Sequence, residues 1–574
     1  MDHVFFLSNG GWKRAREENI YDLVIVGTGF CGLAVAQRAL ERDPRCRILM
    51  IERGPFFLPE HFQNLPLPFV NTLGGLSETF PWTLASSTER GQDGPVRWQH
   101  GMVPFFGGRS TLWSAWCPRP AGEELTGWPQ ATVRAAEANF AAAEKLLGVI
   151  DADRIDRDRA DEELRFLQRK RPIYGALQLR VQALLKTGQG HMPAVYRSQA
   201  APLAASGRGD GLDFQKYSTP GALLDLVVRQ RQREAKGEGA ALHIVTECAV
   251  ERIVQQDGRA TALLTSRGVL PIGDAKLVLA MGTLPPTTLV RSSFPHMAHA
   301  GRRFSAHFIT SIVARVPRDS LDRRGEFGDL EIGACYVAGK ADSWMQQFHI
   351  QLSALSDRDP ERNAATALRY MPDVVATASP AQLLSSRDHV VFVCAVLGEI
   401  GIHNSEVYFR GNPDDPDPTT NSLLRVKIGE ADMATWNAMD ETTFQMLEGV
   451  LSPDGPGQVE YWHGDPNEGT WRPERPVVES RRVDALVHES STLHIGQGDG
   501  DPVDLDYKLR GTENVYITGG ALWPQGGSWN PTMTMVALAM DLADRLVKEQ
   551  AAPPVTTPAH ECVIEDPSDP QPMT

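Results

Sequence analysis

The chain has 574 residues, of which 42% are hydrophobic and 22% are charged, a composition typical of soluble globular proteins. This length predicts two domains, or one nucleotide-binding domain with large insertions. The formal net charge of −15 argues against nucleic acids and anionic membranes as partners, because both attract clustered lysine and arginine.

The seven cysteines are scattered along the chain and include no Cys-x-x-Cys pair. They predict neither a disulfide framework nor a zinc site, and we expect no bound metal. No apolar signal core precedes the first predicted strand, and no apolar run approaches the length of about 20 residues that a membrane span needs. We therefore expect a cytoplasmic protein that binds no membrane.

The predicted elements begin with a β-α-β unit, formed by a strand, a helix and a second strand at 22–26, 33–40 and 47–52. Glycine, proline and aromatic residues then predict an extended loop at 55–108. Two helices are predicted after it, one at 130–148 and a densely charged one at 151–172. Further strands are predicted at 242–254 and 276–281, and alternation predicts an antiparallel sheet from 303–317, 330–339, 346–353 and 389–397. A loop is predicted at 411–420 and the last helix at 532–548. The tail from residue 551 is predicted to be disordered.

The turn after the first strand carries a nucleotide-binding pattern. Gly27, Gly29 and Gly32 fit G-x-G-x-x-G, in which the glycines allow a tight turn, close approach of a pyrophosphate and close packing of the helix. Glu52 ends the next strand, where its carboxylate can accept hydrogen bonds from ribose hydroxyls. The alternative is a tight corner without a ligand, and the pattern alone does not separate NAD from FAD.

Four further segments resemble a known family. Residues 107–119 resemble the flavin-contact loop of the glucose-methanol-choline (GMC) oxidoreductases, most closely that of the pyranose 2-oxidase branch. Residues 515–520 resemble a strand of that branch, and residues 276–288 resemble the family's strand-Gly-Thr segment. Residues 528–534 match the family's Asn-Pro-x-x-Thr.

The resemblance implies an α/β (α+β) fold with two domains. A Rossmann-like FAD-binding domain with βαβ units would take 20–130, 241–300 and 485–550. A substrate-binding domain built on an antiparallel sheet would take 131–240 and 301–484. The contacts with FAD that we expect, in part from the glycine pattern, are Gly27, Gly29, Phe30, Cys31, Gly32, Glu52, Arg53, Arg109, Ser110, Thr111, Trp113, Ser114, Val250, Gly282, Gly520, Asn530, Pro531 and Thr532.

The same resemblance bears on how the flavin is held. Leu112 stands where pyranose oxidases have the histidine that bonds covalently to the flavin. Because a leucine cannot form that bond, we expect FAD to be bound non-covalently.

His488 and Asn530 look like the catalytic pair of the family. Oxidation of an alcohol carbon removes a hydride and a proton, and imidazole is the natural base near neutral pH. Ser491 departs from the family's His-x-x-Gly-Thr, which puts the fine geometry in doubt but not the role of His488. The alternative for Asn530 is a cap of the last helix, with Pro531 in its first turn.

The predicted strand at 346–353 places His349, Gln351 and Ser353 on one face. This face is similar to the sheet that lines the sugar site of pyranose oxidases, and an ordinary amphipathic strand is an equal alternative. His494 is a further candidate for substrate contact, although a buried histidine satisfied by the backbone is the favoured reading for it.

The predicted activity is an FAD-dependent oxidation of an alcohol CH–OH group to a carbonyl, with hydride transfer to flavin N5. We expect a sugar, a glycoside or another polyhydroxylated small molecule as substrate, and O2 or another electron acceptor. The alternatives are an enzyme that acts on a natural-product alcohol, and a non-catalytic flavoprotein.

Overall fold

The computed structural model describes residues 2–18, 20–65, 84–85, 101–155, 172–205, 214–297, 299–341, 346–372, 378–402, 424, 426 and 428–547. Several predictions fall wholly or largely outside these ranges: residues 66–83 and 86–100 of the predicted loop, residues 156–171 of the charged helix, the loop at 411–420 and the tail from 551.

A five-stranded parallel sheet contains the predicted β-α-β unit. Its strand order is β20 (Val515–Ile517), β12 (Lys276–Leu279), β1 (Leu23–Val26), β2 (Ile48–Ile51) and β8 (Leu242–Val245), and every neighbouring pair is parallel. Both faces of such a sheet are covered, which explains why β1 and β2 are continuous apolar runs with every residue buried. The strands predicted at 22–26, 47–52 and 276–281 are confirmed.

The single strand predicted at 242–254 is wrong, because the structure divides it into two. The chain leaves the parallel sheet after Val245 and turns through Glu247, whose φ of 53° lies in the left-handed region that ends a strand. It then enters a separate antiparallel sheet of β9 (Val250–Gln256), β10 (Arg259–Thr265) and β11 (Gly268–Pro271).

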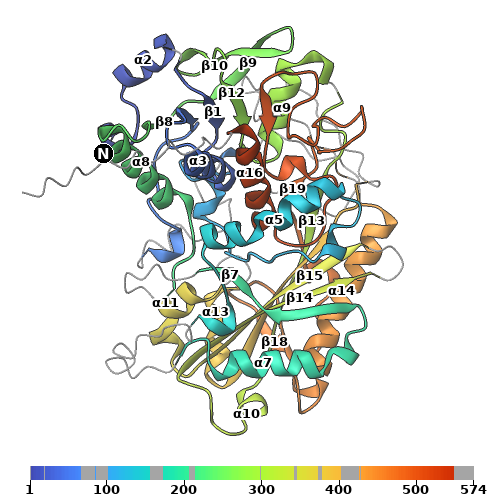
Figure 1. The fold of residues 1–574 in the computed structure, drawn as a ribbon. Helices are drawn as coiled ribbons and strands as arrows, with labels where there is room; N and C mark the ends of the chain where they lie inside the picture. Colours follow the sequence, from blue (N-terminus) through green and yellow to red (C-terminus); the bar gives the residue numbers. More distant parts are fainter. Residues whose placement is uncertain are drawn as a thin grey trace, which may run out of the picture.

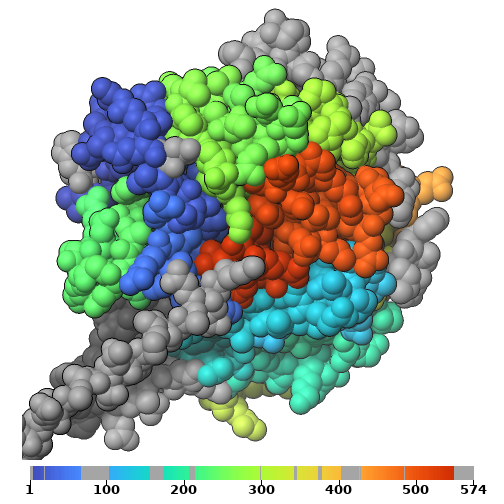
Figure 2. Space-filling view, turned by 45° about the horizontal axis from the view of Figure 1, so that its top comes forward, coloured from blue at the N-terminus to red at the C-terminus, as the bar shows by residue number. Residues whose placement is uncertain are grey.

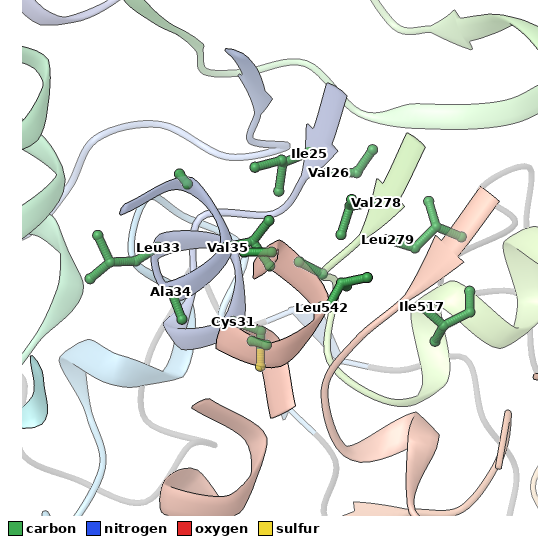
Figure 3. Close-up of a cluster of buried hydrophobic side chains, with 14 of the residues drawn as sticks. Ile25, Val26, Cys31, Leu33, Ala34, Val35, Val278, Leu279, Ile517 and Leu542 are labelled. Carbon is green, nitrogen blue, oxygen red and sulfur yellow. The ribbon is translucent and has the colours of Figure 1, made fainter. Parts of the chain in front are cut away.

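The first and last long helices pack together in one core with the parallel sheet (Figure 3). They are α3 (Phe30–Arg42) and α16 (Thr532–Leu546). Near their N-terminal ends the Cys31 thiol donates to the Met535 carbonyl oxygen at 3.8 Å, and near their C-terminal ends Arg38 pairs with Asp544 at 2.8 Å. The two helices therefore run in the same direction, and their N-termini lie side by side. The helix α5 (Gln130–Leu147) packs on α16.

The second large sheet has eight strands and is antiparallel. Its order is β18 (Thr470–Arg472), β17 (Glu460–His463), β13 (Ser305–Pro317), β16 (His389–Glu399), β15 (Gln347–Asp357), β14 (Leu330–Lys340) and β6 (Val195–Ala200), and β19 (Arg482–Ser490) also pairs with β13. The four antiparallel strands predicted between 303 and 397 are confirmed. One face is covered by α7 (Ala176–Thr187) and α14 (Glu430–Gly449), which pack on residues such as Phe308 and Ile350.

The remaining helices and strands connect or flank these layers. They are α1 (Asp2–Phe5), α2 (Asn9–Glu18), β3 (Leu84–Ala85), β4 (Gly101–Met102), β5 (Val149–Asp151), β7 (Pro202–Ala204), α8 (Thr219–Ala235), α9 (Leu284–Ser293), α10 (Arg318–Leu321), α11 (Pro360–Tyr370), α13 (Pro380–Leu383) and α15 (Val478–Arg481). Within the described ranges, no helix combines the length and the apolar character that a bilayer crossing requires.

The two large sheets occupy opposite halves of the molecule, and α5 and α16 lie where the halves meet, near β13 and β19 of the antiparallel sheet (Figure 1). In the space-filling view, the orange-red segment that leads to α16 lies against the green segment around β9 and β10 and the cyan segment around α5 (Figure 2). Segments far apart in the sequence therefore lie side by side on this face (Figure 2).

Candidate active site

The glycine pattern forms the turn between β1 and α3. Gly27 has a φ of 106°, and a Cβ there would lie 2.4 Å from the carbonyl oxygen of Ala280. A Cβ on Gly32 would lie 2.2 Å from the carbonyl oxygen of Gly27. Gly29 differs from both, because its φ is −73° and the nearest atom to an added Cβ is Gly107 O at 4.0 Å. The space above Gly29 is therefore open, as the approach of a pyrophosphate requires.

Glu52 binds the glycine turn from the end of β2. Its carboxylate accepts from the backbone N–H of Thr28 at 3.2 Å, from Thr28 Oγ1 at 2.5 Å and from the N–H of Gly54 at 3.2 Å. Burial raises the pKa of this carboxyl, and the hydrogen bonds act against that rise. Thr28 Oγ1 in turn accepts from Gly107 N at 3.0 Å, so Glu52 holds the turn and the 107–111 loop together. Its predicted contact with a ribose stays a prediction.

The loop that contains Ser110, Thr111 and Trp113 lies beside this turn. The Ser110 hydroxyl donates to Gly107 O at 2.7 Å, and Trp113 packs edge-on against Phe30 at 4.8 Å between ring centroids. The Thr111 side chain is buried and donates to Gly108 O at 2.9 Å. Ser114 is partly buried, as is Arg53 at the end of β2. Leu112 packs against an apolar cluster formed by Leu58, Phe62 and Phe105.

Two helix N-termini converge on the same region. Neither the cap residue Gly29 of α3 nor the cap residue Pro531 of α16 makes a side-chain cap hydrogen bond, and Cys31 of α3 contacts Met535 of α16. Uncapped N–H groups at adjacent positive helix ends favour a negatively charged group. The open space at Gly29 and these two ends fit a dinucleotide such as FAD.

Hydrogen bonds join the segments that contain the predicted FAD contacts Gly282 and Gly520 to the segment that follows His488. Thr283, which follows Gly282, donates its hydroxyl to Glu489 O at 2.6 Å, and Ser491 N donates to Gly520 O at 3.0 Å. A Cβ on Gly520 would lie 2.8 Å from Glu489 O, so a glycine is needed for this approach. Val250 lies apart from these three segments in sequence and begins β9 with a buried side chain.

His488 lies in a β-bulge of β19. The register pairs Ser305 with Ser490 and His307 with Val487, so β19 has one residue more than β13 over this stretch. His488 also has a φ of 63°, which is uncommon for a residue other than glycine. A bulge re-aims a side chain and is frequent next to active sites, and here it turns the His488 ring toward His307.

The rings of His488 and His307 form a hydrogen-bonded pair. The two Nδ1 atoms are 2.9 Å apart and the ring planes are nearly perpendicular, at 84°. His307 Nε2 contacts the carbonyl oxygen of Gly527 at 2.5 Å. Burial lowers the pKa of His307 to about 4. Burial, then His307 and Arg109, hold the pKa of His488 well below its usual 6.5, against an opposing effect of Glu489. Both imidazoles are therefore neutral near pH 7.

Arg109 forms an ion pair beside His488, and its predicted contact with FAD stays a prediction. Its guanidinium makes a two-point ion pair with Glu489, with N–O distances of 2.9 and 3.0 Å. The Glu489 side chain is 5% exposed, and the guanidinium of Arg109 compensates its charge. The pair joins the 107–111 loop to the residue that follows His488.

Asn530 contacts the polar face of β15 rather than capping α16. Its Oδ1 accepts from Gln351 Nε2 at 2.9 Å, and Gln351 Nε2 also lies 3.2 Å from His349 Nε2. The cap position of α16 is Pro531, and no side chain caps the helix, so the capping alternative for Asn530 is wrong. The reason is that Asn530 is one residue too early and its amide is already engaged by the sheet.

The histidines and amides form one group, which we call the histidine cluster: His307, His349, Gln351, His488 and Asn530. The ring centroids of His307 and His349 are 6.1 Å apart, and the other members are joined by the hydrogen bonds given above. His349 also stacks on Tyr336 at 4.8 Å. The sequence-predicted pair and the sheet face are thus brought to one place.

His494 is not joined to the histidine cluster by any contact within the described ranges. Its Nε2 lies 3.0 Å from Asp501 Oδ1, and burial, followed by Arg303, lowers its pKa to about 4. His494 is buried, as the favoured interpretation expects, but the hydrogen-bond partner of its Nε2 is a carboxylate rather than the backbone.

Sequence reasoning missed His307, although a histidine in the otherwise apolar alternation of 303–317 was a usable signal. It also missed Glu399, which lies opposite His307 in the register and is 2% exposed. Burial raises the pKa of Glu399 to about 7, while the backbone N–H of Gln347 and the Gln525 side chain act against the rise. Its position could not be found without the pairing of β13 with β16.

The comparisons with known proteins agree with this arrangement. The family model described as GMC oxidoreductase matches residues 346–539, which include His349, Gln351, His488 and Asn530. The crystal structure of pyridoxine 4-oxidase from Mesorbium loti is similar in fold, with a TM-score of 0.53 and 16% identity, over 92% of this chain and 99% of that chain. No curated protein matches the sequence. The family match thus covers the C-terminal part of the site, and the fold likeness extends over most of the chain.

Proposed function

We propose that this chain oxidises an alcohol carbon of a sugar, a glycoside or another polyhydroxylated small molecule to a carbonyl. The general activity, FAD-dependent oxidation of a CH–OH group, is supported by the GMC oxidoreductase match over residues 346–539. The proposal for the substrate class rests on one observation, the buried polar face of β14 and β15 that adjoins His488 and Asn530. O2 or another small molecule would accept the electrons.

When bound, FAD supplies the acceptor for the hydride, and the chain's own residues handle the proton and the substrate oxygen. His488 Nδ1 is engaged by His307, whereas its Nε2 has no hydrogen-bond partner in the described part of the chain. A neutral imidazole with a free nitrogen can take the hydroxyl proton. Asn530 Oδ1 is occupied by Gln351, so its Nδ2 remains to donate to the substrate oxygen. His307, His349, Gln351 and Asn530 are buried and His488 is partly buried, which limits competing water.

Three buried polar atoms on the same sheet face support a hydroxyl-rich substrate. Tyr336 Oη, Gln347 Oε1 and Ser353 Oγ have no hydrogen-bond partner within the described ranges. Tyr336 is paired in register with Gln351, and residues 347–353 at alternate positions share one face of β15. An unpaired buried polar group costs about 1–3 kcal/mol, which hydroxyls of a bound substrate would offset. An apolar natural-product alcohol would leave these atoms unpaired.

We also propose that FAD is bound non-covalently. Leu112 offers no nucleophilic atom, and its side chain packs against Leu58, Phe62 and Phe105. Acid or heat precipitation should release the yellow flavin into the supernatant. Flavin that stays with the precipitated protein would contradict the proposal.

The test of the substrate class is anaerobic reduction of the bound flavin, followed by its visible absorbance across a panel of alcohols. The panel would hold monosaccharides, glycosides, aryl alcohols and pyridoxine, with a His488→Ala variant as the matched control. Faster bleaching by polyhydroxylated members would support the proposal, and preference for aryl or apolar alcohols would contradict it. Absence of bleaching by every alcohol would favour a non-catalytic flavoprotein.

A further inference from the structure

The contact between His307 and His488 has to contain one hydrogen. Their Nδ1 atoms are 2.9 Å apart, which is a hydrogen-bond distance, and an imidazole nitrogen can be either a donor or an acceptor. The direction of this bond decides which nitrogen of His488 is protonated. It therefore decides whether the other nitrogen, Nε2, is a base or a donor.

The second contact of His307 settles the direction. Its Nε2 faces the carbonyl oxygen of Gly527, which can only accept, so this nitrogen carries the hydrogen. A neutral imidazole has one N–H, and His307 Nδ1 must then be the acceptor. His307 is 2% exposed, and within the described residues no carboxylate lies within hydrogen-bond distance of its ring. Burial therefore favours the neutral form, in agreement with its lowered pKa.

The carbonyl that orients His307 belongs to a position that requires glycine. Gly527 has a φ of 132°, and an added Cβ would lie 1.9 Å from the ring of Trp529. A side chain is not accommodated at this position, so a glycine is needed for the segment to place its carbonyl oxygen against His307 Nε2. The glycine, His307 and His488 form a chain of two hydrogen bonds with a single direction.

We propose that His307 is a positioning residue that accepts the Nδ1–H of His488 and so fixes the tautomer with a bare Nε2. The proposal rests on the proposed function of His488 as the base. Within the described ranges, His307 is the one hydrogen-bond partner of the His488 ring, which lies on a bulge where the strand ladder does not restrain it. Without His307, the ring could protonate at Nε2 and present a donor to the substrate hydroxyl.

Two substitutions separate the two contacts of His307. In His307→Asn, the amide oxygen can stand near the place of Nδ1 and accept from His488, while the donor to Gly527 is lost. In His307→Gln, the amide nitrogen can stand near the place of Nε2 and donate to Gly527, while the acceptor for His488 is lost. If His307 only holds the Gly527 segment in place, the Gln variant should reduce its flavin faster than the Asn variant. If His307 positions His488, the Asn variant should reduce its flavin faster than the Gln variant.

The kinetic readout is the rate of anaerobic flavin reduction by an active alcohol in flavin-loaded protein. We expect His307→Gln to slow reduction by roughly 10–100-fold, the range found when the hydrogen-bond partner that orients a metal-bound imidazole is removed. We expect His307→Asn to slow flavin reduction much less than His307→Gln does. Equal rates in the two variants, or a slower Asn variant, would overturn the proposal.

A direct readout needs no activity. The holoenzyme would be prepared with histidine labelled with 15N at Nδ1, and the His488 signal assigned as the one absent from His488→Ala. A protonated nitrogen in the wild-type protein is expected, and a partly or wholly bare nitrogen in His307→Gln. A bare His488 Nδ1 in the wild-type protein would overturn the proposal even if neither variant folds. A protonated Nδ1 with no reducing alcohol found would instead leave the tautomer correct and the proposed function wrong.

Discussion

Gly27 and Gly29 are two residues apart, and the structure predicts opposite outcomes for the same substitution. Gly27→Ala places an L-residue at a φ of 106° with its Cβ 2.4 Å from Ala280 O. The left-handed backbone costs about 1–2 kcal/mol, and the overlap with a backbone carbonyl that cannot rotate away costs about 1–3 kcal/mol. We expect the apoprotein to lose about 2–5 kcal/mol of unfolding free energy.

Gly29→Ala introduces neither problem. Its φ is −73°, and the nearest atom to the new methyl group is 4.0 Å away. The change in apoprotein stability should therefore stay within about 1 kcal/mol of zero. The methyl group would nevertheless fill the open space where a pyrophosphate must approach the backbone. We expect Gly29→Ala to fold normally and to lose most of its affinity for FAD.

The assay combines thermal unfolding of the flavin-free proteins with titration of FAD, followed by flavin fluorescence. The expected result is a Gly27→Ala variant with a lower melting temperature and a Gly29→Ala variant with the wild-type melting temperature but weak FAD binding. Wild-type affinity in Gly29→Ala would refute the assignment of the pyrophosphate to this turn. A Gly29→Ala apoprotein less stable than Gly27→Ala would refute the steric reasoning.

Three further predictions concern the histidine cluster. His488→Ala should retain flavin but reduce it roughly 10²–10⁴-fold more slowly in stopped-flow experiments, and a near-normal rate would assign the base elsewhere. Asn530→Asp keeps an oxygen for Gln351 but loses the amide donor and adds a negative charge, so reduction should slow and the flavin potential should fall; an active variant with unchanged potential would contradict this. Because a base acts in its neutral form and the pKa of His488 is held well below 6.5, the reduction rate should stay level as the pH falls from 8 to 6.5 and decline only below that. A midpoint above pH 6.5 would show that His488 is not desolvated as described.

Sequence patterns predicted the fold well where the residues of a single segment were enough to identify the element. The glycine turn, the apolar strands around it and the four alternating strands between 303 and 397 each follow from residue spacing alone. The division of 242–254 did not follow, because the turn at Glu247 interrupts an apolar alternation without glycine or proline. The placement of the domain boundaries and the likeness to the pyranose oxidase branch stay predictions.

The sequence predicted several residues of the candidate site but not the contacts between them. His488 and Asn530 could be named from motifs, but the bulge that orients His488 arises from a register shift between β13 and β19. The partner His307 is 181 residues away in sequence and meets His488 only through that pairing. The ion pair of Arg109 with Glu489 likewise joins segments 380 residues apart, and no local pattern reports it.

The contact between α3 and α16 also has a consequence for synthesis on the ribosome. Cys31 and Arg38 meet partners about 500 positions later, and β20 completes the sheet that β1 begins. The N-terminal unit therefore emerges early but cannot cover its apolar surface until the last helix has left the exit tunnel. Such non-local closure slows folding and prolongs exposure of strand edges, whereas the antiparallel sheet between the two ends can pair as it emerges. We expect nascent chains halted before Thr532 to hold a paired β13–β16 sheet and an open nucleotide corner that recruits chaperones.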